Sequence, residues 1–431
     1  MNYKEKINEL LGYQIIDESK PDDYYRLAEK QYDSQTIMVV IETMLSNQLT
    51  MGKKVKEFET KFAHLHTREF GIMTNSGSSA LLMVFNYINK FNYKNTTKEK
   101  RKVITTMLNW STPIFALLEA DFIPVFVDVN IDDFAINYNE IEDAIDDETC
   151  GILITHLMGN PVFVKPIIDL AEKHNLWVVE DVCESVFSRC MFVSGMLGDF
   201  ACFSFYFTHQ LSTIEGGMIL TNNMMAYNAL LSRRAHGWSR DRTDESALIT
   251  NNKHLDPAFL FVDIGFNFRP TEINAAIGLL QLENFEKTQT ERLQTVYLLN
   301  EILHEFRKGG QIITTKNNVN TIDYTITPFC YYMIMDKEVK ERLVTVLKAN
   351  KIECRPIAMG KYSSHPIGKN TKWLTKSDLI NTDRIFNGGL YIGIHDKFEE
   401  VKVRRIGKIL HDFFSTEFVQ IEKYLKQPYV N

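Results

Sequence analysis

The chain has 431 residues, of which 45% are hydrophobic and 24% charged, and its formal net charge is -7. This composition is typical of a globular protein with a large core, and the length predicts more than one domain. An acidic chain lacks the basic surface of a general nucleic-acid-binding protein, so we expect no nucleic-acid partner.

The N-terminal segment and the apolar runs predict no membrane partner. Residues 1–25 lack the basic and apolar regions of a signal peptide, and no apolar run reaches the roughly 18 residues that a membrane helix needs. We therefore expect a cytoplasmic protein. The six cysteines form no CxxC or CxC pair, which favours reduced thiols and gives no support to a metal site.

Short apolar runs and helical patterns alternate from about residue 75. A helix is predicted at 111–121, with Ser111 or Thr112 as its N-cap and Pro113 in its first turn. Another helix is predicted within 162–175. Strands are predicted at 102–107, 123–129, 151–157, 176–182, 200–206 and 216–221. This alternation indicates an α/β fold with a mostly parallel sheet covered by helices.

The pattern changes after residue 272, where 272–306 reads as one long helix or two helices in series. Beyond it, strands and helices mix less regularly, as in a smaller α/β domain. We therefore predict an N-terminal helical arm at 1–35, a large domain at 36–285, and a linking helix with a small C-terminal domain at 286–431.

A glycine and serines stand at the start of a helical pattern at residues 74–85, TNSGSSALLMVF. Free backbone N–H groups and the positive end of the helix dipole favour an anion at such a helix start. Gly77 and Ser78 are therefore candidate anion-binding residues. An ordinary capped helix explains the same pattern equally well.

Two further candidates follow predicted strands, where α/β proteins place ligands. Trp110 follows the strand at 102–107; its indole could stack on a planar ring, although a core tryptophan is the better interpretation of this residue alone. Glu180 and Asp181 end another strand, and Glu184 comes shortly after. A carboxylate there can hold a pyridinium nitrogen protonated, but Asp181 is also a plausible helix N-cap.

The segment 200–221 carries the last of these motifs. Ser204 closes a predicted strand, His209 follows five residues later, and Gly216 and Gly217 suit a tight turn before the next strand.

In their order and spacing these motifs resemble the sugar-nucleotide aminotransferase and dehydratase family of fold-type I pyridoxal phosphate enzymes. The resemblance implies an aspartate aminotransferase-like fold with a large, mostly parallel domain and a smaller C-terminal α/β domain. Its motifs extend over nearly the whole chain, at 49–59, 74–81, 108–113, 124–129, 178–185, 198–218, 266–283, 353–357 and 387–395.

The resemblance gives each candidate a role in holding pyridoxal phosphate or pyridoxamine phosphate. Gly77, Ser78 and Ser204 would bind the cofactor phosphate. Asn267 would reach the phosphate of the neighbouring subunit's cofactor, which implies a homodimer with shared active sites.

The pyridine ring of the cofactor would take three other residues. By the same resemblance, Trp110 stacks on the ring, Asp181 contacts its nitrogen, and Glu184 lies near its hydroxyl side. No metal ligand belongs to this pattern.

The chain departs from the family at His209, because most members carry at this place the lysine that bonds covalently to the cofactor. No lysine occurs between Lys173 and Lys253, so a small shift of the alignment does not supply one. An imidazole forms no stable imine with an aldehyde, but it can transfer a proton near neutral pH. His209 is therefore the candidate catalytic base.

The residues around His209 are similar to the GDP-4-keto-6-deoxy-D-mannose 3-dehydratase subfamily. That similarity implies that pyridoxamine phosphate, held without a covalent link, reacts at the C4 ketone of a nucleotide-linked keto-sugar and the C3 hydroxyl leaves. Glutamate would regenerate pyridoxamine phosphate. A nucleotide-linked 4-keto-6-deoxy sugar and glutamate are the expected partners.

Two alternatives remain open. In the first, the protein is a sugar-nucleotide aminotransferase that uses His209 as base and leaves the amine on the product. In the second, it is an inactive cofactor- or partner-binding protein on the same scaffold, against which the joint presence of Trp110, Asp181, Ser204 and Asn267 argues.

Three residues are candidate substrate ligands. Arg240 belongs to a basic cluster at 233–242 that could hold a nucleotide diphosphate, or could be a solvated loop. Arg355 resembles the family's substrate-side arginine, and His395 matches a position near the family's active site. Either of these two could instead be a structural contact.

Overall fold

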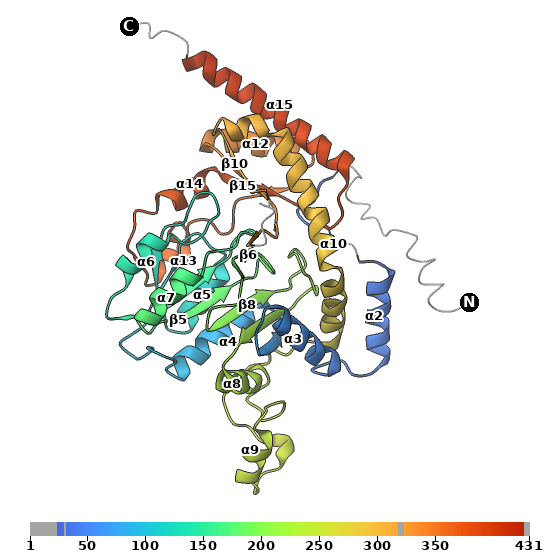
Figure 1. Ribbon diagram of the computed structural model, residues 1–431, viewed down its shortest axis with the longest axis vertical. Helices are drawn as coiled ribbons and strands as arrows, with labels where there is room; N and C mark the ends of the chain where they lie inside the picture. The colour runs from blue at the N-terminus through green and yellow to red at the C-terminus, as the bar shows by residue number, and fades with distance from the viewer. Residues whose placement is uncertain (1–23, 30–31, 318–322, 426–431) are drawn as a thin grey trace, which may run out of the picture.

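The computed structural model of the chain describes residues 24–29, 32–317 and 323–425 (Figure 1). Its centre is an eight-stranded sheet. Neighbouring strands run parallel except at β9 (Gly217–Thr221), which is antiparallel to both of its neighbours. From one edge the sheet contains β1 (Phe70–Thr74), β9, β8 (Phe200–Ser204), β5 (Trp177–Asp181), β4 (Thr149–Thr155), β2 (Lys102–Thr106), β3 (Ile123–Val127) and β14 (Leu374–Thr375). The predicted α/β fold with a mostly parallel sheet is confirmed.

The central strands are buried on both faces, as parallel strands between two helix layers must be. In β4, Ile152 and Ile154 pack into one core and Leu153 into the core on the opposite face. Helices α4 (Gly77–Lys90), α5 (Ser111–Glu119) and α8 (Met224–Arg234) pack with Leu153, whereas α6 (Tyr138–Ala144) and α7 (Lys165–Lys173) cover the other face.

The starts of α4 and α5 matter for the site because both follow strands of the sheet. The side chain of Ser76 accepts a hydrogen bond from the N–H of Ser79 and so caps α4. The N-cap of α5 is Trp110, in extended backbone conformation. The prediction of Ser111 or Thr112 as N-cap is therefore wrong by one or two residues, because these two already belong to the first turn.

A 31-residue helix, α10 (Glu272–Ile302), joins this sheet to the C-terminal part of the chain. It packs against α2 (Ser34–Leu45), α3 (Lys53–Leu65) and α15 (Glu400–Leu425). The second sheet is antiparallel and contains β10 (Ile313–Thr314), β12 (Tyr331–Ile334), β15 (Gly389–Ile392) and β13 (Cys354–Arg355). Helices α11 (His304–Lys308), α12 (Lys337–Ala349), α13 (Pro366–Asn370) and α14 (Ile380–Gly388) complete this part.

The C-terminal part of the chain contributes to both sheets, because β14 pairs with β3 at the edge of the large one. Helix α10 also runs across the predicted boundary at residue 285. The division into three parts therefore stays a prediction, and most of the predicted arm at 1–35 lies outside the described residues.

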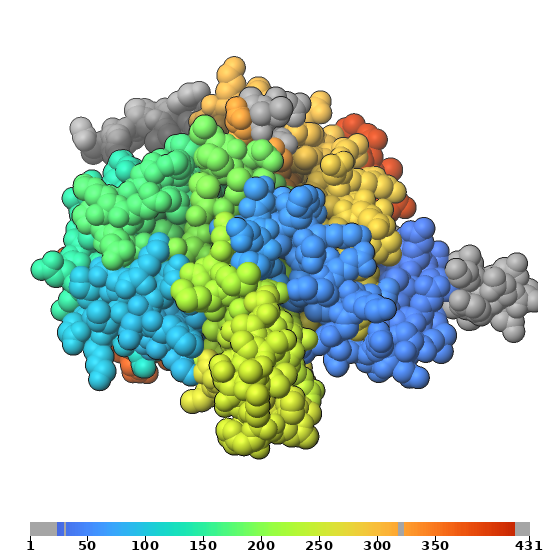
Figure 2. All heavy atoms as spheres, turned by 60° about the horizontal axis from the view of Figure 1, so that its bottom comes forward, coloured from blue at the N-terminus to red at the C-terminus, as the bar shows by residue number. Residues whose placement is uncertain are grey.

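A lobe with α9 (Glu245–Asn251) projects from the molecule at the end opposite α15 (Figures 1 and 2). A small three-stranded sheet of β11 (Tyr324–Thr325), β6 (Arg189–Cys190) and β7 (Phe192–Val193) lies near the middle of the molecule. Among the helices that the structure describes, none combines the length and the apolar character needed to cross a membrane.

Candidate active site

The first turn of α4 meets the carboxyl ends of two central strands. A Cβ added to Gly77 would lie 2.7 Å from Cβ of Ser204, at the end of β8, and 3.1 Å from Sγ of Cys183, just after β5. Only a residue without a side chain allows this approach. The structure therefore brings the predicted phosphate residues Gly77 and Ser204 into contact at the edge of the sheet where α/β proteins bind ligands.

This helix start has the properties of an anion site. The N–H groups of Ser79 and Ala80 bond to Ser76, whereas those of Gly77 and Ser78 belong to the end that a helix presents to an anion. The hydroxyl oxygen of Ser78 lies 3.2 Å from that of Thr112 in the first turn of α5. Two helix starts thus converge at one place. Thr112, which the sequence interpretation took only as a cap, is a further candidate there.

Trp110 lies at the surface of the candidate site. The residue is 53% exposed, whereas Trp177 is fully buried in the core. The interpretation of Trp110 as a core residue is therefore wrong. The turn that holds it is fixed by Asn109, which accepts a hydrogen bond from the Trp110 N–H and donates one of 2.8 Å to Thr155.

Asp181 ends β5 and is buried. Its carboxylate accepts a hydrogen bond of 3.1 Å from the N–H of Cys183, and burial raises its pKa. Turns, not a helix, follow it, so the interpretation as a helix N-cap is wrong. Among the described residues no ion pair is formed by this carboxylate. A cationic ring nitrogen would therefore stabilise its charged form.

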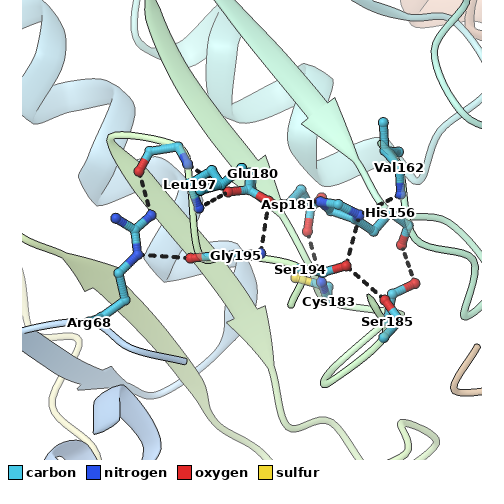
Figure 3. Close-up of polar contacts among 12 residues, drawn as sticks. Arg68, His156, Val162, Glu180, Asp181, Cys183, Ser185, Ser194, Gly195 and Leu197 are labelled. Carbon is cyan, nitrogen blue, oxygen red and sulfur yellow. Dashed lines mark hydrogen bonds and ion pairs between the residues drawn. The ribbon is translucent and has the colours of Figure 1, made fainter. Parts of the chain in front are cut away.

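The adjacent Glu180 points away from Asp181 into a separate polar network (Figure 3). One carboxylate oxygen accepts hydrogen bonds from Nε2 of His156 at 3.0 Å and the N–H of Gly195 at 2.8 Å. The other accepts from the N–H groups of Leu197 and Gly198. Burial alone would raise the pKa of Glu180, but the His156 hydrogen bond and these donors lower it to about 2. Glu180 therefore has a structural role, and Asp181 is the carboxylate that remains as a candidate cofactor ligand at the end of β5.

Glu184 can hold or release a proton near neutral pH. Its carboxylate accepts a hydrogen bond of 3.0 Å from the N–H of Met158. Burial, with a smaller effect of the nearby Asp181 charge, raises its pKa to about 7. A protonated Glu184 can donate a hydrogen bond, which a carboxylate cannot.

His209 is fixed through the same turn that carries Cys183. Its Nδ1 lies 2.6 Å from the carbonyl oxygen of Cys183. Because a carbonyl only accepts, Nδ1 carries the hydrogen, and in the neutral ring Nε2 then carries the lone pair. Phe329 packs edge-on against the imidazole with ring centroids 5.4 Å apart, and Tyr206 does so at 6.0 Å.

Residues far away in the sequence support this loop, and sequence reasoning missed them. Gln210 donates hydrogen bonds to the carbonyl oxygens of Glu184 and Thr327. The buried guanidinium of Arg292, in α10, donates to the carbonyls of Pro328 and Phe329. It also donates to the Ile394 carbonyl and the Asp396 carboxylate.

Arg355 lies one strand away from Tyr391, which is a ring neighbour of the Phe329 that packs against His209. It pairs in the second sheet with Tyr391, whose ring lies 6.3 Å from that of Phe329. Arg240 belongs instead to the projecting lobe, where it is exposed, covers the Trp238 ring at 4.2 Å and donates to the Ala258 carbonyl.

Two predicted residues make their hydrogen bonds outside the group around His209. His395 is buried beside the N-terminal segment, and its Nε2 lies 2.9 Å from the carbonyl oxygen of Arg26. Asn267 is exposed, and its side chain accepts a hydrogen bond from Arg269. Its neighbour Phe268 accepts a hydrogen bond from the N–H of Asn75, just before α4.

The architecture is that of a fold-type I pyridoxal phosphate enzyme, as the solved structures that superpose on it show. Residues 30–411 match the model of the DegT/DnrJ/EryC1/StrS aminotransferase family, and the chain belongs to this family. The predicted family and fold are confirmed, and so is pyridoxal phosphate as the cofactor of the family.

Among the relatives are two enzymes named GDP-4-keto-6-deoxy-D-mannose 3-dehydratase. The one from Yersinia pseudotuberculosis is 29% identical, over 88% of this chain and 96% of its own. The one from Escherichia coli O55:H7 is 27% identical, over 88% and 98%. The E. coli enzyme with bound hydrated PLP superposes with a TM-score of 0.80 at 26% identity, over 90% of this chain and 99% of its own. A GDP-4-keto-6-deoxymannose 3-dehydratase has also been solved with a trapped PLP–glutamate adduct, with the same TM-score and identity, over 90% of this chain and 100% of its own.

Proposed function

We propose that the chain is a 3-dehydratase of a nucleotide-linked 4-keto-6-deoxy-hexose that uses pyridoxamine phosphate, and that His209 is its catalytic base. The observation that carries the proposal is the position of the imidazole. His209 is bound to the carbonyl oxygen of Cys183, and Sγ of the same Cys183 lies 3.1 Å from the position that a Cβ on Gly77 would take. The base and the anion-binding helix start therefore belong to one site.

The residues fit the cofactor by their chemistry. The close approach at Gly77 brings Ser204 to the α4 start, where Ser78 and Ser204 would supply hydroxyl donors to a phosphate. The buried carboxylate of Asp181 has the raised pKa of a group that would gain from a ring cation. The half-exposed indole of Trp110 supplies a stacking surface.

When bound, the cofactor supplies an electron sink that weakens the bonds next to the sugar carbonyl. The chain's residues position and move protons around it. His209 takes a proton at Nε2, because Nδ1 is already bound to the Cys183 carbonyl. Glu184, with a pKa of about 7, can hold a proton beside the ring. A histidine, unlike a lysine, makes no covalent link that must be displaced before each turnover.

Glutamate as amino donor, and a homodimer in which Asn267 reaches the partner's site, belong to the same proposal. The solved relative with the PLP–glutamate adduct supports the first. The exposure of Asn267 is consistent with the second. Arg355, beside the aromatic group of His209, is the candidate ligand for the sugar or for the glutamate carboxylate, and Arg240 is the candidate for the nucleotide diphosphate.

The proposal is tested by incubating the purified protein with pyridoxal phosphate, glutamate and GDP- or dTDP-linked 4-keto-6-deoxy sugars. We expect a product that has lost the C3 oxygen, detected by mass spectrometry, together with 2-oxoglutarate and free ammonia. An amino-sugar product would establish the aminotransferase instead. No turnover together with no cofactor absorbance would favour the inactive, partner-binding protein.

A further inference from the structure

The side chain of His395 is held in one orientation at the end of the second sheet. Its ring stacks on Tyr25 with centroids 4.4 Å apart, and the residue is 6% exposed. Nε2 lies 2.9 Å from the carbonyl oxygen of Arg26. Because this oxygen only accepts, Nε2 carries a hydrogen, and Nδ1 faces the opposite way.

The His395 ring lies beside two carboxylates. Nδ1 lies 3.5 Å from an oxygen of Glu29, and one ring nitrogen of His395 lies within 4.8 Å of one oxygen each of Glu29 and Glu399. A charge-assisted hydrogen bond would be shorter, about 2.7–2.9 Å. A neutral ring would set its lone pair against two anionic groups, so this arrangement calls for a cation between them.

Of two nearby side-chain cations, one already contacts Glu399 and the other is bound outside the group. Lys402 bonds one oxygen of Glu399 at 2.6 Å. Arg292 is bound to Asp396 and to backbone carbonyls. A carboxylate has a second oxygen, so the contact with Lys402 leaves Glu399 able to bind a further cation.

We propose that Glu29, His395 and Glu399 bind one divalent transition-metal ion, and that Zn²⁺ fits the site best. Imidazole with carboxylates suits zinc, whereas calcium and magnesium prefer oxygen ligands alone. Two ligands at about 2.0–2.1 Å in a tetrahedron are separated by about 3.4 Å, close to the 3.5 Å between Nδ1 and Glu29. Metal-binding histidines commonly donate their other N–H to a backbone carbonyl, as His395 does to Arg26.

The ion would link the N-terminal segment, through Glu29, to the C-terminal part of the chain, through His395 and Glu399. Glu29 precedes the segment 30–411 that matches the family, so this ligand set is not contained in the family match. Three residues after Glu29, the Tyr32 hydroxyl lies 3.4 Å from that of Ser212, in the loop that follows His209. Metal binding at His395 would therefore order a segment that contacts the loop of the candidate base.

The test is zinc binding by the full-length protein, first stripped with a chelator, measured by titration calorimetry with ZnCl₂. The double variant Glu29→Gln/Glu399→Gln removes both anionic ligands and keeps their size, and both residues are partly exposed. Glu400→Gln, next to the site but paired with Arg404, is the matched control. We expect one equivalent of zinc for wild type and control, and at least about tenfold weaker binding for the double variant.

Equal zinc binding by wild type and double variant would overturn the proposal, and so would an equal loss in Glu400→Gln. A cobalt(II) titration separates this site from the cysteines. A wild-type spectrum without a thiolate charge-transfer band supports the proposed ligands, whereas a thiolate band that persists in the double variant assigns the metal to cysteine. The assay measures metal binding alone, so its result does not depend on the proposed dehydratase reaction.

Discussion

Nδ1 of His209 lies 2.6 Å from the carbonyl oxygen of Cys183, which fixes the imidazole to the turn that follows Asp181. Sγ of Cys183 is also a neighbour of Gly77. One turn of the backbone therefore sets the distances between the candidate base, the carboxylate at the end of β5 and the helix start that is the candidate anion site. The first two predictions concern this imidazole.

Replacing His209 by asparagine should abolish turnover of the keto-sugar and preserve cofactor binding. The asparagine amide can still donate to the Cys183 carbonyl, but it offers no basic nitrogen. Loss of a general base costs about 10²–10⁴-fold in rate. The rate is measured by mass spectrometry of the product, and bound cofactor by its absorbance. Turnover near the wild-type rate would contradict the role as base.

Replacing His209 by lysine should give a protein that borohydride labels irreversibly with pyridoxal phosphate. The side chain at 209 adjoins the residues that would hold the cofactor phosphate, so an amine there lies within reach of the aldehyde. Peptide mass spectrometry locates the label. Wild type, treated in the same way, is the control, and an unlabelled residue 209 in the variant would refute the placement of the cofactor.

The neighbours Glu180 and Asp181 should respond in opposite ways to loss of charge. Glu180→Gln breaks a buried charged network and should cost about 3–5 kcal/mol in the free energy of unfolding. The pKa of Glu180 is lowered to about 2, so this cost is present above pH 4.5 and disappears as the pH falls towards 2. Asp181→Asn should leave the stability of the cofactor-free protein unimpaired, because burial already raises the pKa of Asp181, and should weaken cofactor binding.

These two variants are compared by guanidinium denaturation and by cofactor titration. Each serves as the control of the other, since the two carboxylates are adjacent on one strand. An unstable Asp181→Asn, or a Glu180→Gln as stable as wild type at neutral pH, would reverse the assignment of the two residues.

Glu184→Gln should remove a pH dependence of stability. The pKa of Glu184 is raised from 4.5 to about 7 in the folded protein. As the pH rises from about 4.5 to about 7, the unfolded chain loses this proton before the folded one, so its contribution to stability is progressively lost. Between pH 5 and 8, the melting temperature of the cofactor-free protein should therefore fall more for wild type than for Glu184→Gln. The exposed control Glu283→Gln should behave like wild type. Parallel profiles for all three proteins would contradict the shift.

Gly77→Ala should weaken cofactor binding. The added Cβ would approach Ser204 and Cys183 too closely, and relief of such overpacking costs about 1–3 kcal/mol, which corresponds to roughly a 5- to 150-fold rise in Kd for pyridoxal phosphate. Gly309→Ala is the control, because its nearest atom would lie at 3.3 Å. Equal affinities in a fluorescence titration would show that the α4 start does not border the cofactor.

Much of the large sheet was predictable because its strands are short apolar runs between helical patterns. The predicted strand at 176–182, for example, differs from β5 by one residue at each end. The predicted helix at 111–121 begins where α5 begins, but its N-cap was wrong because Ser111 and Thr112 are common caps, whereas here Trp110 takes that position. Propensity describes single residues, and the turn at Asn109 decides the helix start through a bond to Thr155.

The support around the candidate site was not predictable from local patterns. The contacts of Gln210 with Thr327, and of Arg292 with Phe329, join segments that are distant along the chain. The different roles of Glu180 and Asp181 follow from the alternation of side chains along β5, which was present in the sequence as a signal but not applied to them. His395 was placed near the site by resemblance alone, and its contacts are with the N-terminal segment.

The guanidinium of Arg292 binds Pro328, Phe329 and Ile394 through their backbone oxygens, so it joins the segment that leads into β12 to the segment that follows β15, whatever side chains they carry. The Phe329 ring that rests against the imidazole is positioned by this tie. A chimaera between family members that takes α10 from one parent and the C-terminal sheet from the other would keep these backbone bonds but exchange side chains, such as Phe329, that pack against the candidate base. Recombination at the end of α10 is therefore a route to altered selectivity that leaves the histidine loop intact.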